Sequence, residues 1–177
     1  MKTIMIMFVL LLNLLQLEAA ADAKKDKATE KPKETLYMCG VEIYLGMKRD
    51  AIEKSISGCS EKGSDKYNIP LWRDENIAGV IGFNESNSVI SAYREWHPAD
   101  DSPSEIIKTF VKAVDSLPVK ERLNNTVNVY TRNEPDVDTH SVVVWFQGHK
   151  SIQLETTELR HNKKLTYVSI REYLRAQ

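Results

Sequence analysis

The sequence predicts an α+β protein in which two α-helices pack on one face of an antiparallel β-sheet of five to seven strands. Two segments, 47–58 and 102–118, carry apolar residues at helical spacing. Seven short segments are rich in the Val, Ile, Thr and aromatic residues typical of strands. Short polar turns separate most successive strands, which favours antiparallel pairing and therefore this class of fold.

The first 21 residues have the pattern of a secretory signal peptide. Lys2 supplies a positive start, an apolar run follows from 4 to 17, and small residues come next: Ala19, Ala20, Ala21 and Ala23. The run is shorter than the roughly 20 residues that a membrane-spanning helix needs. We therefore expect a secreted or periplasmic protein with no stable membrane insertion after signal cleavage, which falls before Asp22 or before Lys24.

Residues 22–35 alternate Lys with Asp or Glu and contain no large apolar side chain, which predicts a flexible charged linker. The remaining residues, 36–177, suit a single domain. Hydrophobic residues make up 42% of the chain and charged residues 28%, as in a globular protein. The 24 Lys and Arg are balanced by 25 Asp and Glu, so the sequence lacks the positive excess of a nucleic-acid-binding protein.

The cysteines, Cys39 and Cys59, are predicted to form a disulfide. Cys39 lies in a strand-like segment, LYMCGVEIYLG, and Cys59 follows a helix-like segment, MKRDAIEKSISG. A helix that folds back at Gly46 brings the two sulfurs to the same side, because the two elements have similar lengths. A redox-active pair usually has the closer C-x-x-C spacing, and two cysteines alone make an incomplete metal site. We therefore expect a structural disulfide and no cofactor.

The first helix is predicted over 47–58, where Gly58 ends an amphipathic pattern. Its apolar face consists of Met47, Ala51, Ile52 and Ile56. The polar stretch 60–70, which contains Gly63 and Pro70, is expected to be a loop. Strands at 77–83 and 88–96 then form a hairpin with a polar turn, Asn84-Glu85-Ser86-Asn87. Neither face of the second strand is uniformly apolar, so the sequence does not show which face of this strand points to the core.

The second helix begins at a capping box, Ser102-Pro103-Ser104-Glu105, and ends before Pro118. Its broad apolar stripe consists of Ile106, Ile107, Phe110, Val111, Val114 and Leu117. Turn residues separate the four strands expected after it, at 126–131, 141–147, 151–157 and 165–173.

A segment in the first half resembles a known unit. Leu45-Gly46-Met47, a short amphipathic helix and a hairpin with Phe83-Asn84 in one arm and Val89-Ile90-Ser91 in the other are similar to the helix-plus-hairpin unit of small exported bacterial proteins. These include the SmpA/OmlA-type outer-membrane assembly factors and the β-lactamase-inhibitor-protein-like domains. The resemblance covers residues 45–96 and implies protein binding without catalysis. The chain departs from the assembly factors by lacking a lipid-anchor Cys and by adding a helix and four strands.

Four residues are candidates for contact with a partner: Trp72, Arg94, Trp96 and His97. Tryptophan and arginine dominate the binding energy of protein interfaces. Core packing is the alternative for Trp72 and Trp96, and it is the interpretation that we adopt for Trp145 within VVVWF. The sequence thus predicts an exported, non-enzymatic domain that binds another envelope or extracellular protein.

Two alternatives remain open. A small exported hydrolase would use His97 with Asp100 or Asp101, which follow it closely. A metal-binding protein would use the histidines of the expected turns, His140, His149 and His161. The sequence contains no G-x-S-x-G elbow, no pair of histidines at metal-ligand spacing and no phosphate-binding loop. We therefore expect no metal and assign no catalytic residue.

Overall fold

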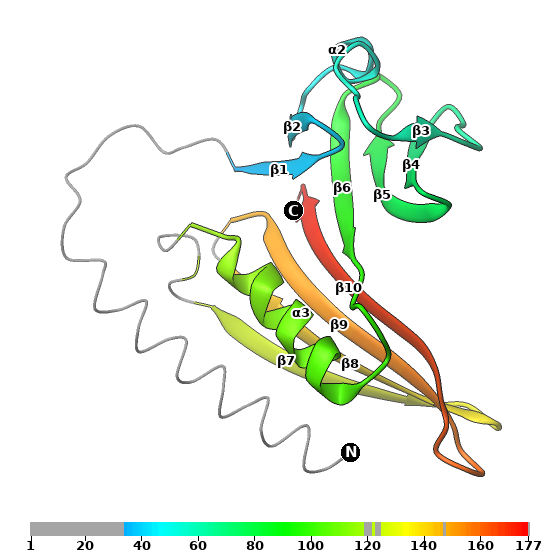
Figure 1. Ribbon diagram of the computed structural model, residues 1–177. Coiled ribbons are helices and arrows are strands. Elements are labelled where there is room, and N and C mark those ends of the chain that lie inside the picture. The colour runs from blue at the N-terminus through cyan, green and yellow to red at the C-terminus, as the bar shows by residue number, and fades with distance from the viewer. Residues whose placement is uncertain (1–33, 119–121, 123–124, 147, 177) are drawn as a thin grey trace.

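The computed structural model describes residues 34–118, 122, 125–146 and 148–176, and a curved eight-stranded antiparallel sheet dominates them (Figure 1). The predicted signal peptide and nearly all of the predicted linker lie outside the described residues. The elements are β1 (Thr35–Met38), β2 (Val41–Tyr44), α2 (Arg49–Glu53), β3 (Ser60–Glu61), β4 (Asn68–Arg73), β5 (Asn76–Phe83), β6 (Val89–Trp96), α3 (Pro103–Asp115), β7 (Thr126–Asn133), β8 (Val137–Trp145), β9 (Lys150–Leu159) and β10 (Leu165–Arg175).

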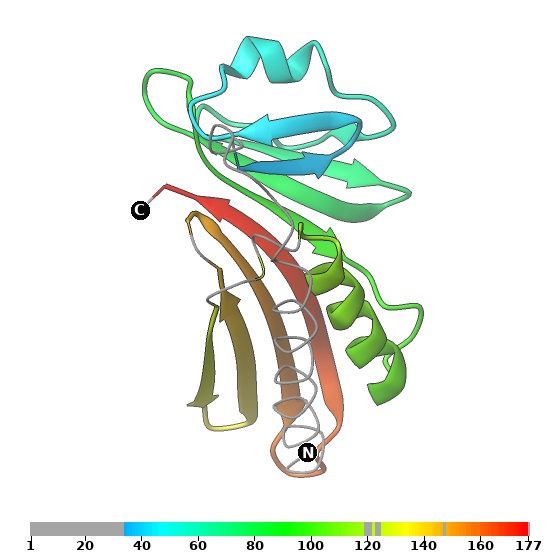
Figure 2. The same ribbon diagram turned by 90° about the vertical axis from the view of Figure 1, so that its left-hand side faces the viewer.

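The strand order of the large sheet is β3-β4-β5-β6-β10-β9-β8-β7, while β1 and β2 form a separate two-stranded sheet. Each half of the large sheet is a meander of successive antiparallel strands. The halves join where β10 pairs with β6, with Arg94 opposite Glu172. In Figure 2, β6 and β10 run between an upper part with α2 and the β1–β2 hairpin and a lower part with α3.

The predicted α+β class is wrong, because strands account for 53% of the structure and helices for 14%. The large sheet has eight strands, more than the five to seven expected, and α2 is only five residues long. The helix predicted over 47–58 ends early because the Ser57 backbone N–H donates to the Cys39 carbonyl (2.8 Å) instead of continuing the helix. The Ser55 hydroxyl donates to the Ala51 carbonyl (2.7 Å), a contact that weakens helices.

Two further differences raise the strand content. The segment predicted as one N-terminal strand is the β1–β2 hairpin, which turns at Cys39 and Gly40, both with positive φ (53° and 77°). The expected loop 60–70 contains β3 and the start of β4. Pro70 lies inside β4 opposite Val80, and its carbonyl accepts from the Lys62 backbone N–H (3.4 Å). A proline that we interpreted as a break in the chain pattern is thus part of a strand.

The second helix is confirmed as α3. The Ser102 side chain accepts a hydrogen bond from the Glu105 backbone N–H (3.4 Å), and Pro103 occupies the first helical position. Ile106, Phe110 and Val114 are buried against the sheet. The hairpin of β5 and β6 and the four strands after α3 are also confirmed.

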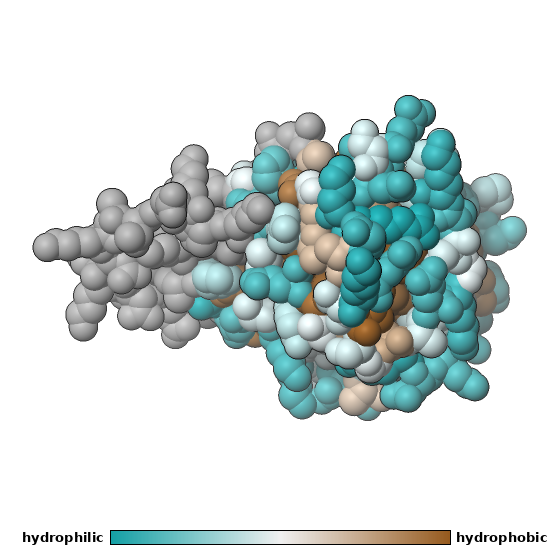
Figure 3. Space-filling view, turned by 90° about the horizontal axis from the view of Figure 1, so that it is seen from above, coloured by the Kyte–Doolittle hydropathy of each residue, from teal (hydrophilic) through white to brown (hydrophobic). Residues whose placement is uncertain are grey.

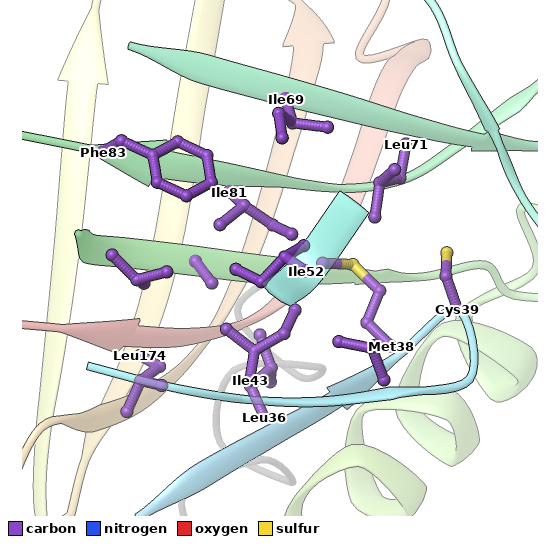
Figure 4. Packing of buried hydrophobic residues seen from close by; sticks show 13 residues of the cluster. Leu36, Met38, Cys39, Ile43, Ile52, Ile69, Leu71, Ile81, Phe83 and Leu174 are labelled. Carbon is purple, nitrogen blue, oxygen red and sulfur yellow. The ribbon is translucent and has the colours of Figure 1, made fainter. Parts of the chain in front are cut away.

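Two hydrophobic clusters lie on the same face of the large sheet. In the first, Ile52 of α2 packs among residues of the β1–β2 hairpin and of β4–β6 (Figure 4). In the second, α3 packs over β8–β10. Ala92 and Leu174 are paired and belong to the first cluster, whereas Trp96 and Ile170 are paired and contribute to the second. Because side chains two residues apart in a strand share a face, α2, α3 and the hairpin all cover one side.

The surface at the α2 end of the molecule is mainly hydrophilic. Seen from above, it shows hydrophobic residues only in small areas between polar and charged side chains (Figure 3). Acidic and basic residues nearly balance over the whole chain, with a net charge of -1. The net charge therefore gives no indication of a partner's charge, and a binding site has to be sought in local geometry.

Candidate functional site

A cleft of about 380 Å³ lies where β6 separates from β5, beside the β1–β2 hairpin. We call it the β1–β6 cleft. Two of the four predicted partner-binding residues, Arg94 and His97, line it, and Trp72 and Trp96 do not. Its other polar lining residues are Tyr37, Arg73, Asp74, Asn76 and Glu95. Met38, Cys39 and Ala78 complete its lining.

Arg94, which lines the cleft, holds three elements together. Its guanidinium donates to the Tyr37 carbonyl of β1 (3.2 Å), to the Ser116 hydroxyl at the end of α3 (3.4 Å) and to the Glu172 carboxylate of β10. It also lies 4.1 Å from the centre of the Trp96 ring, a cation–π contact. Arg94 therefore organises the cleft as well as lining it.

The two tryptophans do not line the cleft. Trp96 packs against the cluster beneath α3. Trp72 lies in β4, and the Lys62 ammonium is 5.8 Å from the centre of its ring. The indole N–H groups of both are buried and have no hydrogen-bond partner among the described residues. The core alternative for Trp96 thus matches its position, while Trp72 belongs to a separate partly buried site.

Tyr37, Arg73, Asp74 and Asn76 are cleft residues that the sequence analysis missed. Tyr37 is 61% exposed on β1, and the other three belong to the β4–β5 hairpin. Asp74 and Glu75 have positive φ (47° and 67°), so they form the tight turn of this hairpin. The polar run RDEN, between two apolar segments, is the sequence signal for this turn. No feature of the sequence identifies Tyr37 as a cleft residue, because its position depends on how the β1–β2 hairpin crosses the large sheet.

The two acids of the cleft, Glu95 and Asp74, differ in whether their carboxylates have partners. Both carboxylate oxygens of Glu95 are bonded, one to the Ser169 hydroxyl (2.7 Å) and the other to the Arg171 guanidinium (2.7 Å). Burial lowers the pKa of Arg171, but its hydrogen bonds to Glu95 and Tyr173 and the charge interactions with the same two residues together outweigh this effect, so the pKa is raised overall. Glu95 is therefore committed to an internal ion pair. Asp74 is exposed at the turn, and the structure describes no ion pair for its carboxylate.

The histidine and acids of the hydrolase alternative are not brought together. The Nε2 atom of His97 lies 2.9 Å from the Ile77 carbonyl oxygen. The Asp100 carboxylate accepts from the Ser102 backbone N–H (2.8 Å). Hydrogen bonds from the Ser102 side chain and backbone lower the pKa of Asp100, so this acid stabilises the start of α3. Asp101 is exposed beside it.

The other histidines are dispersed. His140 lies in β8 with its Nδ1 atom 3.2 Å from the Thr131 hydroxyl, whereas His149 and His161 lie in the β8–β9 and β9–β10 turns. Within the described ranges, no three His, Cys, Asp or Glu side chains are grouped so that they could hold a metal ion. The geometry therefore offers no support for the metal-binding alternative.

The predicted disulfide is confirmed. Cys39 and Cys59 are bonded, with their Cα atoms 5.6 Å apart. The bond connects the β1–β2 turn to the segment that follows α2, and Cys39 is one of the residues that line the cleft. Arg73 lies beside it, with its Nη2 atom 3.8 Å from the Cys59 Sγ atom. The disulfide thus ties Cys39, a residue that lines the cleft, to the segment between α2 and β3.

The fold and the cleft define a β-sheet protein with an internal disulfide and a surface cleft lined by both polar and apolar residues. Comparisons of the chain with protein-family models, curated proteins and solved structures found no match. Among the residues that the structure covers, no helix is both long enough and apolar enough to cross a membrane.

Proposed function

We propose that this chain is an exported, non-enzymatic binding protein that holds another envelope or extracellular protein at the β1–β6 cleft. The observation that carries the proposal is the meeting of an exposed tyrosine, Tyr37, with Arg73, Arg94 and His97 in one concave site. Tyrosine and arginine are among the residues that dominate binding energy in protein interfaces. A concave site also removes more of a bound side chain from water than a flat surface does.

The internal contacts of the cleft favour binding. Arg94 and Glu95 are held by partners from β10 and α3, so the part of the cleft that these two residues line is fixed before a ligand arrives. A site that is already ordered loses less conformational entropy when a partner binds. Tyr37 and the β4–β5 turn, on the open side of the cleft, are exposed and can contact a partner protein.

Export is supported by two features. The signal-peptide pattern of residues 1–21 predicts transport out of the cytoplasm. A structural disulfide forms and persists mainly in oxidising compartments, such as the periplasm or the extracellular space. We therefore place the partner in the same compartments, in line with the protein-binding role that the resemblance over residues 45–96 implies.

Site-specific crosslinking in the native host tests the proposal. The full chain, with its own leader and a C-terminal tag, is produced with a photoreactive phenylalanine at Tyr37. A second version carries the same group at Tyr67, which is also exposed (46%) but does not line the cleft. We expect a defined crosslinked protein from position 37 and none from position 67.

Three results would contradict the proposal. The first is the absence of a crosslink at position 37, and the second is the same set of products from both positions. The third is a measured turnover that His97→Ala abolishes, since it would establish catalysis at this site and favour the hydrolase alternative. Arg175→Gln, on the exposed end of β10, serves as the variant that should leave crosslinking unchanged.

A further inference from the structure

The cleft contains a guanidinium group that lacks an acidic partner. Arg73 is exposed, and its contacts are long ones: its Nε atom is 3.4 Å from the Gly58 carbonyl oxygen and its Nη2 atom is 3.8 Å from the Cys59 Sγ atom. No carboxylate lies within ion-pair distance of Arg73 among the described residues. An arginine can donate five hydrogen bonds in a fixed planar arrangement, so most of the donors of Arg73 remain free.

The other charges of the cleft cannot serve Arg73. Glu95 is nearly buried, with 7% of its side chain exposed, and it is bonded to Arg171 and Ser169. Arg94 is neutralised by Glu172. The side of the cleft nearest the disulfide therefore carries a positive charge without an ion-pair partner among the described residues, next to the exposed carboxylate of Asp74 on the neighbouring turn.

Of the two arginines that line the cleft, Arg73 is the one that a ligand can reach. Its side chain is exposed, whereas the Arg94 guanidinium is already bonded to Tyr37, Ser116 and Glu172. Guanidinium groups prefer carboxylates as partners because the two planar groups form paired hydrogen bonds.

From these contacts we infer that the β1–β6 cleft binds an acidic segment of the partner protein, with an Asp or Glu carboxylate of that segment paired to Arg73. This inference rests on the proposed function and adds the chemistry of the partner. Tyr37 then packs beside the segment at the open rim, and Asp74 opposes binding of the acid. Arg73 and Asp74, which are neighbours in the β4–β5 hairpin, thus have opposite effects on the affinity for the acidic segment.

Selection from a random peptide library displayed on phage tests the inference without knowledge of the partner. The bait is the purified full chain. Peptides that bind it are expected to be enriched in Asp and Glu. Arg73→Gln should weaken binding of a selected peptide about tenfold, the loss expected when one charge-assisted hydrogen bond is removed. Asp74→Asn should strengthen it, and Arg175→Gln should leave it unchanged.

Each outcome has a clear meaning. A library that yields no enriched peptide, peptides without enrichment in acidic residues, or equal binding to the chain and to Arg73→Gln would each overturn the inference. Circular dichroism of Arg73→Gln before and after the assay checks that the variant is folded, and Arg73→Lys tests whether charge alone suffices. The crosslink from Tyr37 is independent of these results, so the proposed function can stand where the acidic ligand fails.

Discussion

Arg94 and Glu172 face each other across β6 and β10, in the gap between the two hydrophobic clusters. The Lys150 ammonium lies 3.9 Å from the second Glu172 oxygen, and Lys150 and Glu172 are only 5% and 3% exposed. The covered face of the sheet is therefore apolar at both ends and ionic in the middle. This arrangement connects a residue of the cleft, Arg94, to the stability of the whole sheet.

Glu172→Gln should lower the free energy of unfolding by about 3 kcal/mol, because it leaves buried positive charge without its carboxylate. Urea denaturation of both proteins measures the difference. Glu134→Gln is the control, since Glu134 is 48% exposed and its ion pair with Arg132 lies at the surface. That change should cost less than about 1 kcal/mol. Equal effects of the two substitutions on the free energy of unfolding would show that the buried ion pair stabilises the protein no more than the exposed one does.

Gly79 illustrates what a single sequence conceals at the residue scale. A Cβ atom at this position would lie 2.1 Å from the Tyr93 carbonyl oxygen and 2.2 Å from the Met38 Sδ atom. Only glycine therefore lets the β1–β2 hairpin cross so close to β5 and β6. In the sequence, Gly79 is an unremarkable residue within an apolar strand. Its close contacts exist only after the hairpin has been placed, and the position of Tyr37 in the cleft depends on them.

At the scale of elements, local patterns predicted α3 and the strands after it, since their periodicity and capping residues act within a few positions of the chain. The length of α2 could not be predicted in this way. It depends on the hydrogen bond from Ser57 to Cys39, two residues far apart in the sequence. The same is true of the cleft: Arg94 and His97 were identified by residue type, but Arg73 and Asp74 join them only because the β4–β5 turn lies beside the end of β6.

The β8 strand is connected to the β9–β10 turn by a cluster of charges with a predictable response to acid. Asp138 accepts from Arg160 (2.7 Å) and Lys163 (3.1 Å), and these hydrogen bonds lower its pKa below the usual value. The ionised form is therefore favoured more in the folded chain than in the unfolded one. This contribution to stability is present above the unfolded pKa of about 3.9 and is lost as the pH falls through the lower folded value.

Asp138→Asn should make the stability of the protein less dependent on pH between about 5 and 2, the range in which the wild-type chain loses this contribution. Urea midpoints measured across that range give the two curves. Asp136→Asn, at a nearby position for which the structure describes no ion pair, should leave the slope unchanged. Parallel curves for the wild type and Asp138→Asn would contradict the assignment.

At the scale of the whole molecule, the two clusters have separate covering elements but share strands. β6 contributes Ala92 to one cluster and Trp96 to the other, and β10 contributes Leu174 and Ile170 in the same way. Loss of order in either half therefore removes pairing partners from the other. We expect the domain to unfold in one cooperative step, as most small domains do.

The disulfide provides a test of this cooperativity, because it lies wholly in the half that contains α2 and the cleft. It closes a loop between residues separated by 20 positions. Non-reducing mass spectrometry should find the chain two hydrogens lighter than its reduced form.

Replacing Cys39 and Cys59 together by serine should lower the free energy of unfolding by about 3 kcal/mol. Because the halves share β6 and β10, circular dichroism and tryptophan fluorescence should shift to the same lower urea midpoint. If one signal shifted while the other kept its midpoint, the two clusters would be independent folding units, and the cleft could open without disturbing the sheet beneath α3.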